Sequence, residues 1–585
     1  VTGVQTCALP ILIDRAVGLD PNAQRVLCQE HPSLYYDLLS IDVGITPSLA
    51  GVNQPGDVIA VKPISEFLLK WRAFQQRVAG EHVADVAFVG GGAGGVELCL
   101  AVHQYLQVQL QNTRIHRMPR LHLVMDSDVP LTSHNAEVQE AVGRHLAQRD
   151  ITVHNNFRVA SVNDGLMTSS DSQQLKADEI FWVTQAAAQS WLADAGLDVD
   201  DRGFIAVLDT LQSTSHPNVL AAGDIAHVLK HPRPKAGVFA VRQGAPLERN
   251  IRRLLAGKKA RGFKPQRQFL SLISMGGQYA IASKGRLKME GGWVWIWKNW
   301  IDRRFMRRFS ELPVMPQPKQ SGLLTELDSQ MRCGGCGSKV AADMLTEVLQ
   351  ELEFTERGPG VTLGVSAMED AAVLEVTPGK SLVQTVDAFR AFIEDPWLFG
   401  RISVLHAVSD IYAMGAEPKT ALAQVSLPYS RPGLMQSTLR QLMAGVLAQL
   451  ELEGMTLVGG HTNEAAELAL GLTINGEAQA DLLLTKNGLQ PGHALILTKA
   501  LGTGTLFAAD MQHRAKGAWI QAALDHMLVS NRAAAQLARE YSASACTDVT
   551  GFGLVGHLLE LLRASGMNAR INLAALPIQI GRAHV

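Results

Sequence analysis

Apolar and polar positions alternate in the first part of the chain and predict short strands. From about residue 12 the alternating stretches are brief and are separated by turn residues, which is typical of β-strands. The pattern around residues 64–76 predicts a helix. The segment VADVAFVGGGAGGVELCLAV then predicts a buried strand, a glycine-rich turn and a second helix. We therefore expect an α/β arrangement in this part of the chain.

The glycine-rich turn contains Gly90, Gly92 and Gly95 in a GxGxxG pattern. A lone GxGxxG is weak evidence, but this one lies between a buried strand and a helix, as dinucleotide binding requires. Glycines at these positions let the backbone approach a pyrophosphate at the helix N-terminus. The acidic residue expected about 20 positions further on is not obvious. The second strand, RLHLVMDSD, comes later in the chain and ends at Asp126. The choice between NAD and NADP therefore stays open.

Residues 291–309, GGWVWIWKNWIDRRFMRRF, combine tryptophans with arginines. A basic amphipathic segment with aromatic residues can lie on a membrane surface. Alternatively, Trp293, Trp295 and Trp297 alternate along a strand packed on the preceding domain, and the arginines from 303 to 308 lie on a solvated helix. We favour the strand, because only one short stretch is involved. Residues 312–322, LPVMPQPKQSG, predict a linker between domains.

Residues 331–341, MRCGGCGSKVA, form a glycine-rich leader that carries Cys336 and Lys339. Its CxxC could be half of a zinc site, but the other cysteines are scattered and supply no second pair. A thioredoxin-like pair should open a helix directly after a strand, whereas the preceding residues indicate a linker and a helix. A thiol and an ammonium three residues apart can instead fold over a small anionic substrate.

Four aspartates stand in separate settings: Asp370 in MEDAAV, Asp387 in TVDAF, Asp410 in SDIYAMG and Asp548 in TDVTGFG. Taken singly, each would serve as a helix cap or lie in a solvated turn. Mg²⁺ prefers oxygen ligands and usually takes one or two carboxylates together with nucleotide phosphates. With the GGHTNE segment at Gly459, Gly460 and His461, the aspartates therefore predict a site for Mg²⁺ and a nucleotide.

Composition limits the class of protein. A chain of 585 residues has room for three or four domains, because single cores stop growing near about 250–300 residues. With 47% hydrophobic and 18% charged residues it is expected to be globular. A formal net charge of −2 argues against a nucleic-acid partner, which would require a basic face. The six cysteines show no evident pairing and indicate a reducing compartment.

Both ends of the chain look foreign. The segments VTGVQTCALPI and IGRAHV resemble translated sequencing-adapter sequence. Neither has the charged region and cleavage pattern of a signal peptide. We therefore expect an internal fragment of a longer protein, in which residues 1–11 and 580–585 are non-native.

From about residue 332 to residue 577 the chain resembles the selenophosphate synthetases, also called selenide, water dikinases. The resemblance rests on GCGSK, EDAAV, TVDAF, DPWLFGRI, SDIYAMG, GGHTNE, LTKALGTG and TDVTGFGLVGH, in unbroken family order. It implies synthesis of selenophosphate, AMP and orthophosphate from selenide, ATP and water. By motif match, the catalytic residues would be Cys336 and Lys339, the Mg²⁺ ligands Asp370, Asp410 and Asp548, and the ATP-binding residues Lys339, Asp387, Asp410, Gly459, Gly460 and His461.

Three positions depart from the family pattern. Ser338 occupies the place of a frequent second cysteine, Glu369 replaces the first of two aspartates, and His406 replaces a common asparagine four residues before Asp410. The spacing of Cys336 and Lys339 is retained, so Ser338 does not argue against activity. We expect His406 to alter local polar contacts rather than the reaction.

Residues 12–260 resemble the pyridine nucleotide-disulfide oxidoreductases, in particular the NADH dehydrogenase-like flavoproteins. The resemblance rests on the GxGxxG unit followed by AAGDIAHV and RPKAGVFAVRQGAPLERNI. It implies FAD and NAD(P)H as cofactors, FAD contacts at Gly223 and Asp224, and a place for Glu97 near the flavin and the nicotinamide. The first FAD motif of the family should precede this region and is missing. An alternative function is NADH:quinone-type oxidoreduction with a silent or different ATP-using second half.

The two resemblances imply an α/β and α+β multidomain protein. A Rossmann-type FAD/NAD(P)-binding oxidoreductase would be followed by a two-domain synthetase with the aminoimidazole ribonucleotide synthetase-like fold. The expected divisions are an oxidoreductase at 12–260, an aromatic, basic segment and linker at 261–331, an ATP-binding domain at 332–480 and a truncated C-terminal domain at 481–579. In the last of these, HALILTKALGTG is expected to begin a new strand pattern. The resemblance also implies a homodimer formed through the first synthetase domain, and a cytoplasmic protein for which peripheral membrane contact is an alternative.

Overall fold

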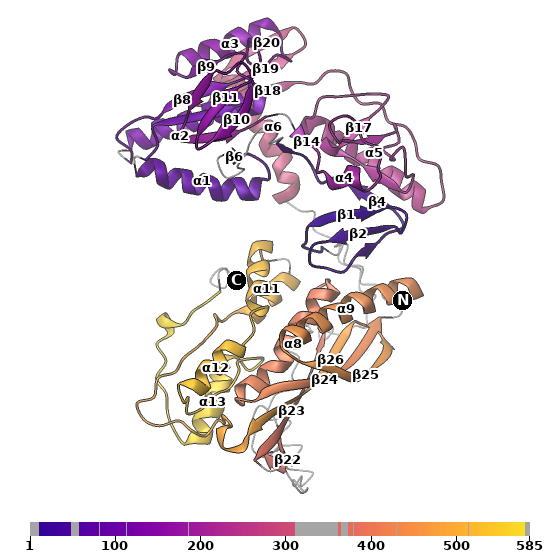
Figure 1. Cartoon of the computed structure of the whole chain (residues 1–585), viewed down its shortest axis with the longest axis vertical. Coiled ribbons are helices and arrows are strands. Elements are labelled where there is room, and N and C mark those ends of the chain that lie inside the picture. Colours follow the sequence, from indigo (N-terminus) through magenta and orange to yellow (C-terminus); the bar gives the residue numbers. More distant parts are fainter. Residues whose placement is uncertain are drawn as a thin grey trace, which may run out of the picture. The chain divides into compact units, whose positions relative to one another are not determined.

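The computed structural model describes residues 11–47, 58–310, 361–363 and 372–579, apart from residues 81, 113, 185, 378, 429 and 513. The chain divides into two compact units, which are described separately (Figure 1). The first unit comprises residues 16–28 and 33–316, and the second comprises residues 1–15, 29–32 and 317–585.

A five-stranded parallel sheet forms part of the first unit, in the order β6-β13-β7-β8-β9. Its strand β7 (Asp85–Val89) is apolar on both faces, as expected where both faces of a parallel sheet are covered. Val86 and Phe88 belong to a core shared with helices α1, α2 and α3, whereas Ala87 and Val89 pack against strands β10 and β11. The elements concerned are β6 (Ile59–Ala60), α1 (Ile64–Ala79), α2 (Ala93–Gln111), β8 (Arg120–Val124), α3 (Ala136–Ala147), β9 (Thr152–His154), β10 (Val159–Asn163), β11 (Leu166–Ser169), β12 (Gln174–Lys176) and β13 (Glu179–Trp182). The predicted helix at 64–76 and the strand, turn and helix around GxGxxG are confirmed.

The rest of the first unit is built from short strands around a separate core. That core contains Ile41, Phe204, Val219 and Ile225. The elements of this part are β1 (Ala16–Asp20), β2 (Arg25–Cys28), β3 (Leu34–Tyr35), β4 (Leu39–Ile41), β5 (Thr46–Pro47), β14 (Ala186–Ala187), α4 (Trp191–Asp194), β15 (Ile205–Val207), β16 (Val219–Ala221), η2 (Gly223–Ile225), β17 (Ala226–Val228) and α5 (Gly237–Leu255). The short strands expected from residue 12 onward are therefore present.

The aromatic segment forms a helix, α6 (Gly292–Ser310), so the expectation of a strand there is wrong. Val294 is buried, and Trp295 and Trp297 are partly buried, against the antiparallel sheet of β18 (Ser271–Ser274), β19 (Ala280–Lys284) and β20 (Leu287–Gly291). Every second residue from 293 to 297 is tryptophan, which suits a strand locally. The segment forms a helix instead, and one face of that helix is buried against β18 to β20. Val294 and Trp297 lie on this face, because helical side chains three residues apart point to the same side.

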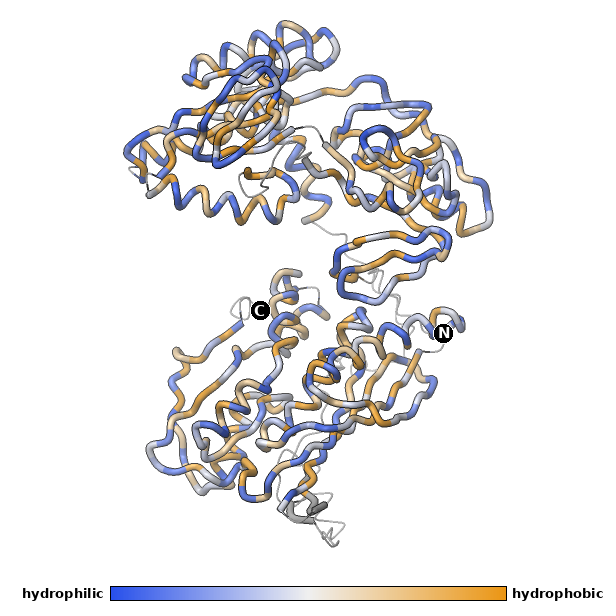
Figure 2. Tube along the Cα trace, viewed as in Figure 1, coloured by the Kyte–Doolittle hydropathy of each residue, from blue (hydrophilic) through white to orange (hydrophobic). Residues whose placement is uncertain are grey.

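A mixed six-stranded sheet organises the second unit, in the order β21-β22-β23-β26-β24-β25. Helices α8 and α9 pack on one of its faces and form a core with β23, β24 and β26. The bounds are β21 (Val361–Leu363), β22 (Ala372–Thr377), β23 (Lys380–Arg390), α8 (Pro396–Ala413), β24 (Glu417–Pro428), α9 (Pro432–Leu452), β25 (Thr456–Ala465) and β26 (Ala469–Gln479). Along most of its length α8 is hydrophobic (Figure 2), and it is buried on nearly all sides, as an apolar helix must be.

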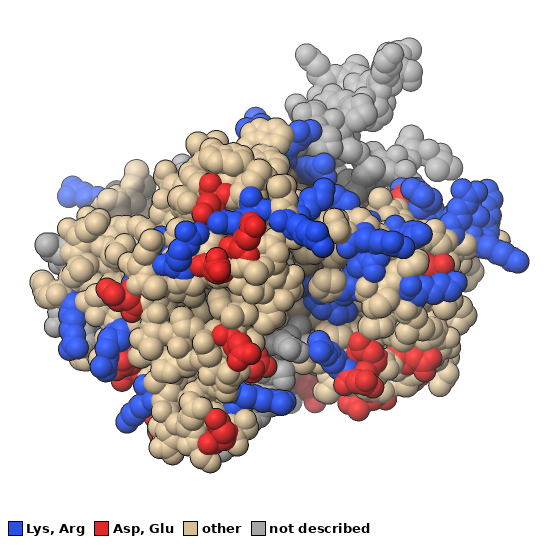
Figure 3. All heavy atoms as spheres, turned by 90° about the horizontal axis from the view of Figure 1, so that it is seen from above, with Lys and Arg blue, Asp and Glu red and all other residues tan. Residues whose placement is uncertain are grey.

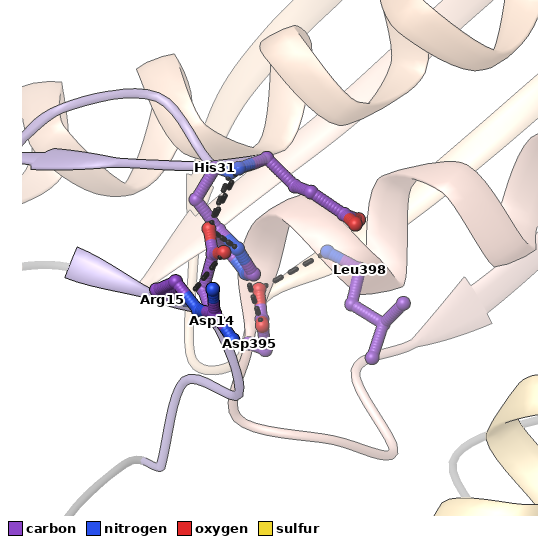
Figure 4. A network of polar contacts seen from close by, with 6 residues as sticks. Asp14, Arg15, His31, Asp395 and Leu398 are labelled. Carbon is purple, nitrogen blue, oxygen red and sulfur yellow. Dashed lines mark hydrogen bonds and ion pairs between the residues drawn. The ribbon is translucent and has the colours of Figure 1, made fainter. Parts of the chain in front are cut away.

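The N-terminus of α8 is held by a buried polar network within the second unit (Figure 4). Asp395 caps the helix by accepting a hydrogen bond from the backbone N–H of Leu398 at 3.0 Å, and Pro396 follows at the first helical turn. His31 lies between Asp395 and Asp14, with its ring nitrogens 2.7 Å and 2.9 Å from their carboxylate oxygens. Burial opposes protonation of His31, but the hydrogen bonds to Asp395 and Asp14 outweigh it and raise the pKa.

We predict that Gly445→Ala destabilises the second unit, because α8 and α9 cross at glycines. A Cβ atom on Gly445 would lie 2.0 Å from the carbonyl oxygen of Trp397, which is backbone and cannot move alone. We expect a loss of about 1–3 kcal/mol in the free energy of unfolding, measured by urea denaturation. Gly433→Ala in the same helix is the matched control, because the added methyl group would meet nothing within 4 Å. Equal unfolding midpoints for the two variants would contradict this account of the crossing.

The remainder of the second unit is mostly helical after β26. It contains η6 (Ala480–Leu482), α10 (Thr503–Met511), α11 (Gly517–Met527), α12 (Arg532–Glu540), α13 (Gly553–Ser565) and η7 (Leu573–Ala575). The strand expected to begin at HALILT is not present, since residues 493–498 have no regular secondary structure and Ile496 is 86% exposed. An alternating pattern forms a strand only where a neighbouring strand supplies hydrogen bonds, and the described residues provide none there.

The face drawn in Figure 3 has Lys and Arg side chains interspersed with Asp and Glu. This mixture agrees with the formal net charge of −2 for the whole sequence. Among the helices of the described ranges, none combines the length and the hydropathy needed to cross a bilayer.

Candidate functional site

Two of the predicted aspartates lie at the junction of β23 and α8 in the second unit. Alternation along β23 places Thr385 and Asp387 on the same face as Val383 and Phe389, which are buried in the core that α8 shares. On α8, His406 and Asp410 are four residues apart and therefore lie one turn apart on one side of the helix. The sequence thus brings two carboxylates, a hydroxyl and an imidazole to one place.

The contacts at this junction connect the two elements. The hydroxyl of Thr385 donates a hydrogen bond to Oδ2 of Asp410 at 2.5 Å. The Nε2 atom of His406 lies 3.4 Å from Oδ2 of Asp387, and the edge of its ring meets Phe389 at a centroid distance of 4.7 Å. Asp387 is buried, with only 10% of its side chain exposed. Carboxylate and hydroxyl oxygens suit a hard cation such as Mg²⁺, so the donor set fits the predicted use.

Thr385 and His406 were not predicted as site residues. Thr385 stands two positions before Asp387 on the same strand, so the alternation contains a signal for it. His406 was noted as a departure from the family pattern, and the structure shows that it contacts Asp387 rather than lying apart from the site.

Gly459, Gly460 and His461 lie on β25, at the edge of the sheet, and all three are exposed. The register aligns Asp387 with Leu472, Leu472 with Ala423, and Ala423 with Gly460. Gly460 is thus level with Asp387 but three strands away, roughly 14 Å at about 4.8 Å per strand. A Cβ atom on Gly460 would lie 2.0 Å from the carbonyl oxygen of Ala423, so this position needs glycine.

Asp548, the other predicted metal ligand within the described ranges, lies on a different element from Asp387 and Asp410. Asp548 is partly exposed in the loop before α13, where the backbone N–H of Thr550 lies 3.2 Å from Nε2 of His557. Cys336, Lys339 and Asp370 lie outside the described residues. Within the described ranges, no cluster of three His, Cys, Asp or Glu side chains is arranged to hold a metal ion.

The GxGxxG turn of the first unit lies between β7 and α2, and its three glycines differ in their surroundings. Gly90 has φ of +136°, and a Cβ atom there would lie 2.4 Å from the carbonyl oxygen of Val183. A Cβ on Gly95 would lie 1.9 Å from the carbonyl oxygen of Gly90, so only glycine lets α2 approach the turn. Gly92, the N-cap of α2, has nothing within 4 Å. Two tightly packed glycines and one open glycine fit a dinucleotide site, because the open position at Gly92 leaves space for a pyrophosphate at the helix N-terminus.

Gly223 and Asp224 form a short 3₁₀ turn after β16 and line a cavity together with Lys235 and Gln243. Gly223 has φ of +74°, and its backbone N–H donates a hydrogen bond to Gln243 Oε1 at 2.6 Å. Nearby, burial and the charge of Asp224 raise the pKa of Asp42. A glycine turn that lines a cavity is compatible with a bound cofactor.

Glu97 lies on α2, where its carboxylate accepts a hydrogen bond from the backbone N–H of Ser274 on β18 at 2.7 Å. Burial raises the pKa of this carboxyl group, and the hydrogen bond from Ser274 opposes the shift. Its contact in the structure is therefore with β18, and its assignment to the nucleotide site stays a prediction.

Comparison with known proteins defines the class of each half. A family model described as pyridine nucleotide-disulphide oxidoreductase matches residues 10–244. Models for the N-terminal and C-terminal domains of AIR synthase related protein match residues 368–478 and 490–583. The chain is thus an oxidoreductase domain followed by a two-domain module of the AIR synthase type, as the predicted fold class requires.

The second half can be placed more narrowly. The chain is 39% identical over 251 residues to the selenide, water dikinase of Pelobacter propionicus, covering 43% of this chain and 71% of that protein. It is 38% identical over 257 residues to the selenide, water dikinase of Myxococcus xanthus, covering 44% and 71%. Through its C-terminal part the chain belongs to the selenide, water dikinase family, which confirms the resemblance. Among solved structures, the sulfide:quinone oxidoreductase of Aquifex aeolicus matches with 14% identity and a TM-score of 0.43, over 52% of this chain and 76% of that one.

Proposed function

We propose that the second half of the chain synthesises selenophosphate from selenide, ATP and water and releases AMP and orthophosphate, and that the first half is a pyridine nucleotide-dependent flavin oxidoreductase. The observation that carries the first part is the contact between β23 and α8, where Thr385 bonds Asp410 and His406 lies against Asp387. This contact lies inside a module whose relatives are selenide, water dikinases. Carboxylates on packed elements can hold a nucleotide and its metal in a defined place.

The proposed site combines these residues with the leader. Asp370, Asp410 and Asp548 would hold Mg²⁺, and Asp387 with Gly459, Gly460 and His461 would bind ATP. Bound Mg²⁺ would neutralise the charge that develops on the phosphate oxygens. Lys339 places a mobile positive charge over the phosphates. The same charge favours the thiolate of Cys336, the form that can hold or deliver selenium.

In the first half, Gly90, Gly92 and Gly95 would bind NAD(P)H, and Gly223 with Asp224 would contact FAD. Glu97 would act near the flavin and the nicotinamide. Covalent linkage of the two halves motivates a further hypothesis, in which the oxidoreductase supplies reducing equivalents that generate or maintain selenide. A full-length protein without NAD(P)H-dependent support of selenophosphate formation from oxidised selenium would count against the hypothesis.

The test of the main proposal is a nucleotide-product assay with and without selenide. AMP and orthophosphate formed only with selenide are expected. Release of ADP would indicate a different ATP-using enzyme of the same fold. Quinone reduction by NADH, without any selenide-dependent AMP, would favour the alternative of a quinone-type oxidoreductase with a silent second half.

We also propose that the second half forms a homodimer through its sheet. On the face opposite α8 and α9, the exposed side chains include Val386 and Leu422, of which 68% and 41% are accessible. Among the described residues, the helices that contact this sheet most extensively are α8 and α9, on its other face. Sedimentation of the protein as a monomer at micromolar concentration would contradict the proposal.

We further propose that α6 makes peripheral contact with an anionic membrane surface. Trp293, Ile296 and Trp300 are more than half exposed and lie on one side of the helix, and exposed arginines continue this side toward residue 307. The guanidinium of Arg304 lies over the ring of Trp300 at 5.3 Å. Aromatic residues followed by cations suit the boundary between headgroups and acyl chains.

We predict that Trp293→Ser with Trp300→Ser lowers binding to vesicles containing phosphatidylserine by at least about fivefold, because aromatic burial drives this attachment. Co-sedimentation measures the bound fraction. Leu287→Ser, an exposed apolar residue on β20, is the control and should bind like the wild type. Equal binding to neutral and anionic vesicles, or no effect of the double substitution, would exclude α6 as an anionic-membrane contact.

A further inference from the structure

A buried carboxylate connects the two domains of the synthetase module. Glu453 follows the last turn of α9 in the range matched by the N-terminal domain model, and only 3% of its side chain is exposed. Its Oε2 atom accepts hydrogen bonds from Tyr412 at 2.5 Å and from Ser530 at 3.0 Å, and its Oε1 atom accepts one from Gln449 at 3.1 Å. A buried charge is tolerated only when it is satisfied in this way.

The C-terminal domain contributes the positive charge of this network. Nη2 of Arg532, the first residue of α12, lies 3.4 Å from Oε2 of Glu453. Its Nε donates to the hydroxyl of Tyr412 at 3.0 Å, and its Nη1 donates to the carbonyl oxygen of Leu452 at 3.1 Å. Burial and the hydrogen bond to Glu453 raise the pKa of Tyr412 to about 12. We call the set Tyr412, Gln449, Glu453, Ser530 and Arg532 the Glu453 joint.

The Glu453 joint acts on the segment of α8 that carries Asp410. Asn531 donates a hydrogen bond to the hydroxyl of Ser409, the neighbour of Asp410, at 2.9 Å. Tyr412 stands two residues beyond Asp410 on the same helix. Further along α12, Ala535 packs into the core of the N-terminal domain. Residues of the C-terminal domain therefore contact α8 both before and after Asp410, at Ser409 and at Tyr412.

The same helix leads to the other predicted metal ligand. Helix α12 ends at Glu540, and the loop with Asp548 follows before α13 begins at Gly553. Residues on different domains can act on the same substrate only when the contact between the domains is held in one fixed geometry. The ion pair of Glu453 and Arg532 favours one arrangement of the two domains. If the domains separated, Glu453 would stay partly desolvated and would lose the positive charge of Arg532.

We propose that Glu453 and Arg532 are positioning residues for the synthetase reaction, which set the loop of Asp548 relative to Asp410. The inference rests on the proposed function. The ATP contacts proposed at Asp387 and at residues 459–461 lie within the N-terminal domain, so we expect substitutions in the joint to leave them nearly unchanged.

The test is steady-state kinetics of Glu453→Gln and Arg532→Ala with varied Mg²⁺ and ATP. We expect kcat to fall about tenfold and the Mg²⁺ concentration for half-maximal rate to rise about tenfold, while KM for ATP at saturating Mg²⁺ changes less than about twofold. Arg532→Lys retains the cation and should recover part of the rate. Arg514→Ala, an exposed arginine of the same domain, is the control and should match the wild type.

Folded variants with wild-type kcat and Mg²⁺ dependence would overturn the inference. If Glu453→Gln fails to fold, the paired variant Glu453→Gln/Arg532→Gln leaves no unpaired charge and serves the same test. If the wild type makes no selenide-dependent AMP, the proposed function has failed instead. The joint is then tested by hydrogen exchange of residues 544–551 with Mg²⁺ and a non-hydrolysable ATP analogue. Faster exchange in Glu453→Gln than in the wild type is expected, and equal exchange would reject the joint.

Discussion

Cys336→Ala is expected to reduce selenide-dependent AMP formation by at least about a thousandfold, as removal of a covalent nucleophile does in other enzymes. The physical reason is that a thiolate beside an ammonium is both nucleophilic and soft, whereas a methyl group can neither hold nor deliver selenium. Lys339→Ala should have a comparable effect, because it removes the charge that favours the thiolate and contacts the phosphates. AMP is measured chromatographically in paired reactions with and without selenide.

Cys333→Ala is the matched control for this experiment, since it removes the other thiol of the same leader. We expect it to keep most of the activity. NADH oxidation by the first half should be unchanged in all three variants, because its glycine-rich turn lies in a separate unit. Full selenide-dependent activity in Cys336→Ala would refute the role assigned to this thiol.

Asp410→Asn is expected to lower kcat/KM for Mg·ATP about a hundredfold. The amide keeps the size of the carboxylate and can still accept the hydrogen bond from Thr385, so the substitution removes charge and leaves the packing of α8 nearly unchanged. A neutral oxygen is a much weaker ligand for Mg²⁺ than a carboxylate. Calorimetric titration with a non-hydrolysable ATP analogue at several Mg²⁺ concentrations separates loss of metal affinity from loss of nucleotide affinity.

Two further variants support the interpretation of Asp410→Asn. Thr385→Val removes the hydroxyl but no charge and should have a smaller effect. Asp510→Asn replaces an exposed aspartate on α10 and should have none. Wild-type affinity of Asp410→Asn for Mg·ATP would remove Asp410 from the proposed metal site.

Much of the fold was predictable where the signal is local. The GxGxxG turn required a strand before it and a helix after it, and β7 and α2 occupy those places. Asp387 and Asp410 were predicted from short motifs, and the structure places them on facing elements. Asp410 lies against Thr385 and Asp387 lies against His406, and their assignment as site residues stays a prediction.

The incorrect expectations concern segments whose structure depends on distant partners. Tryptophans at 293, 295 and 297 alternate as in a strand, yet the core under β18 to β20 stabilises a helix. Residues 493–498 have a strand-like pattern, and the described residues supply no strand to pair with them. In both cases the local pattern permits two structures, and contacts far away in sequence choose between them.

The sequence alone determined the order of the two enzymatic halves, the glycine turn of the first and the motifs of the second, because these depend on neighbouring residues and on their chemistry. Tertiary structure alone decided that Asp387 on β23 is level with Gly460 on β25, three strands away. It likewise decided that His406 contacts Asp387. It also decided that Glu453 meets Arg532, 79 positions later in the chain (532 minus 453). Strand register and helix packing bring such residues together, and both are set by burial of the whole core rather than by any short stretch.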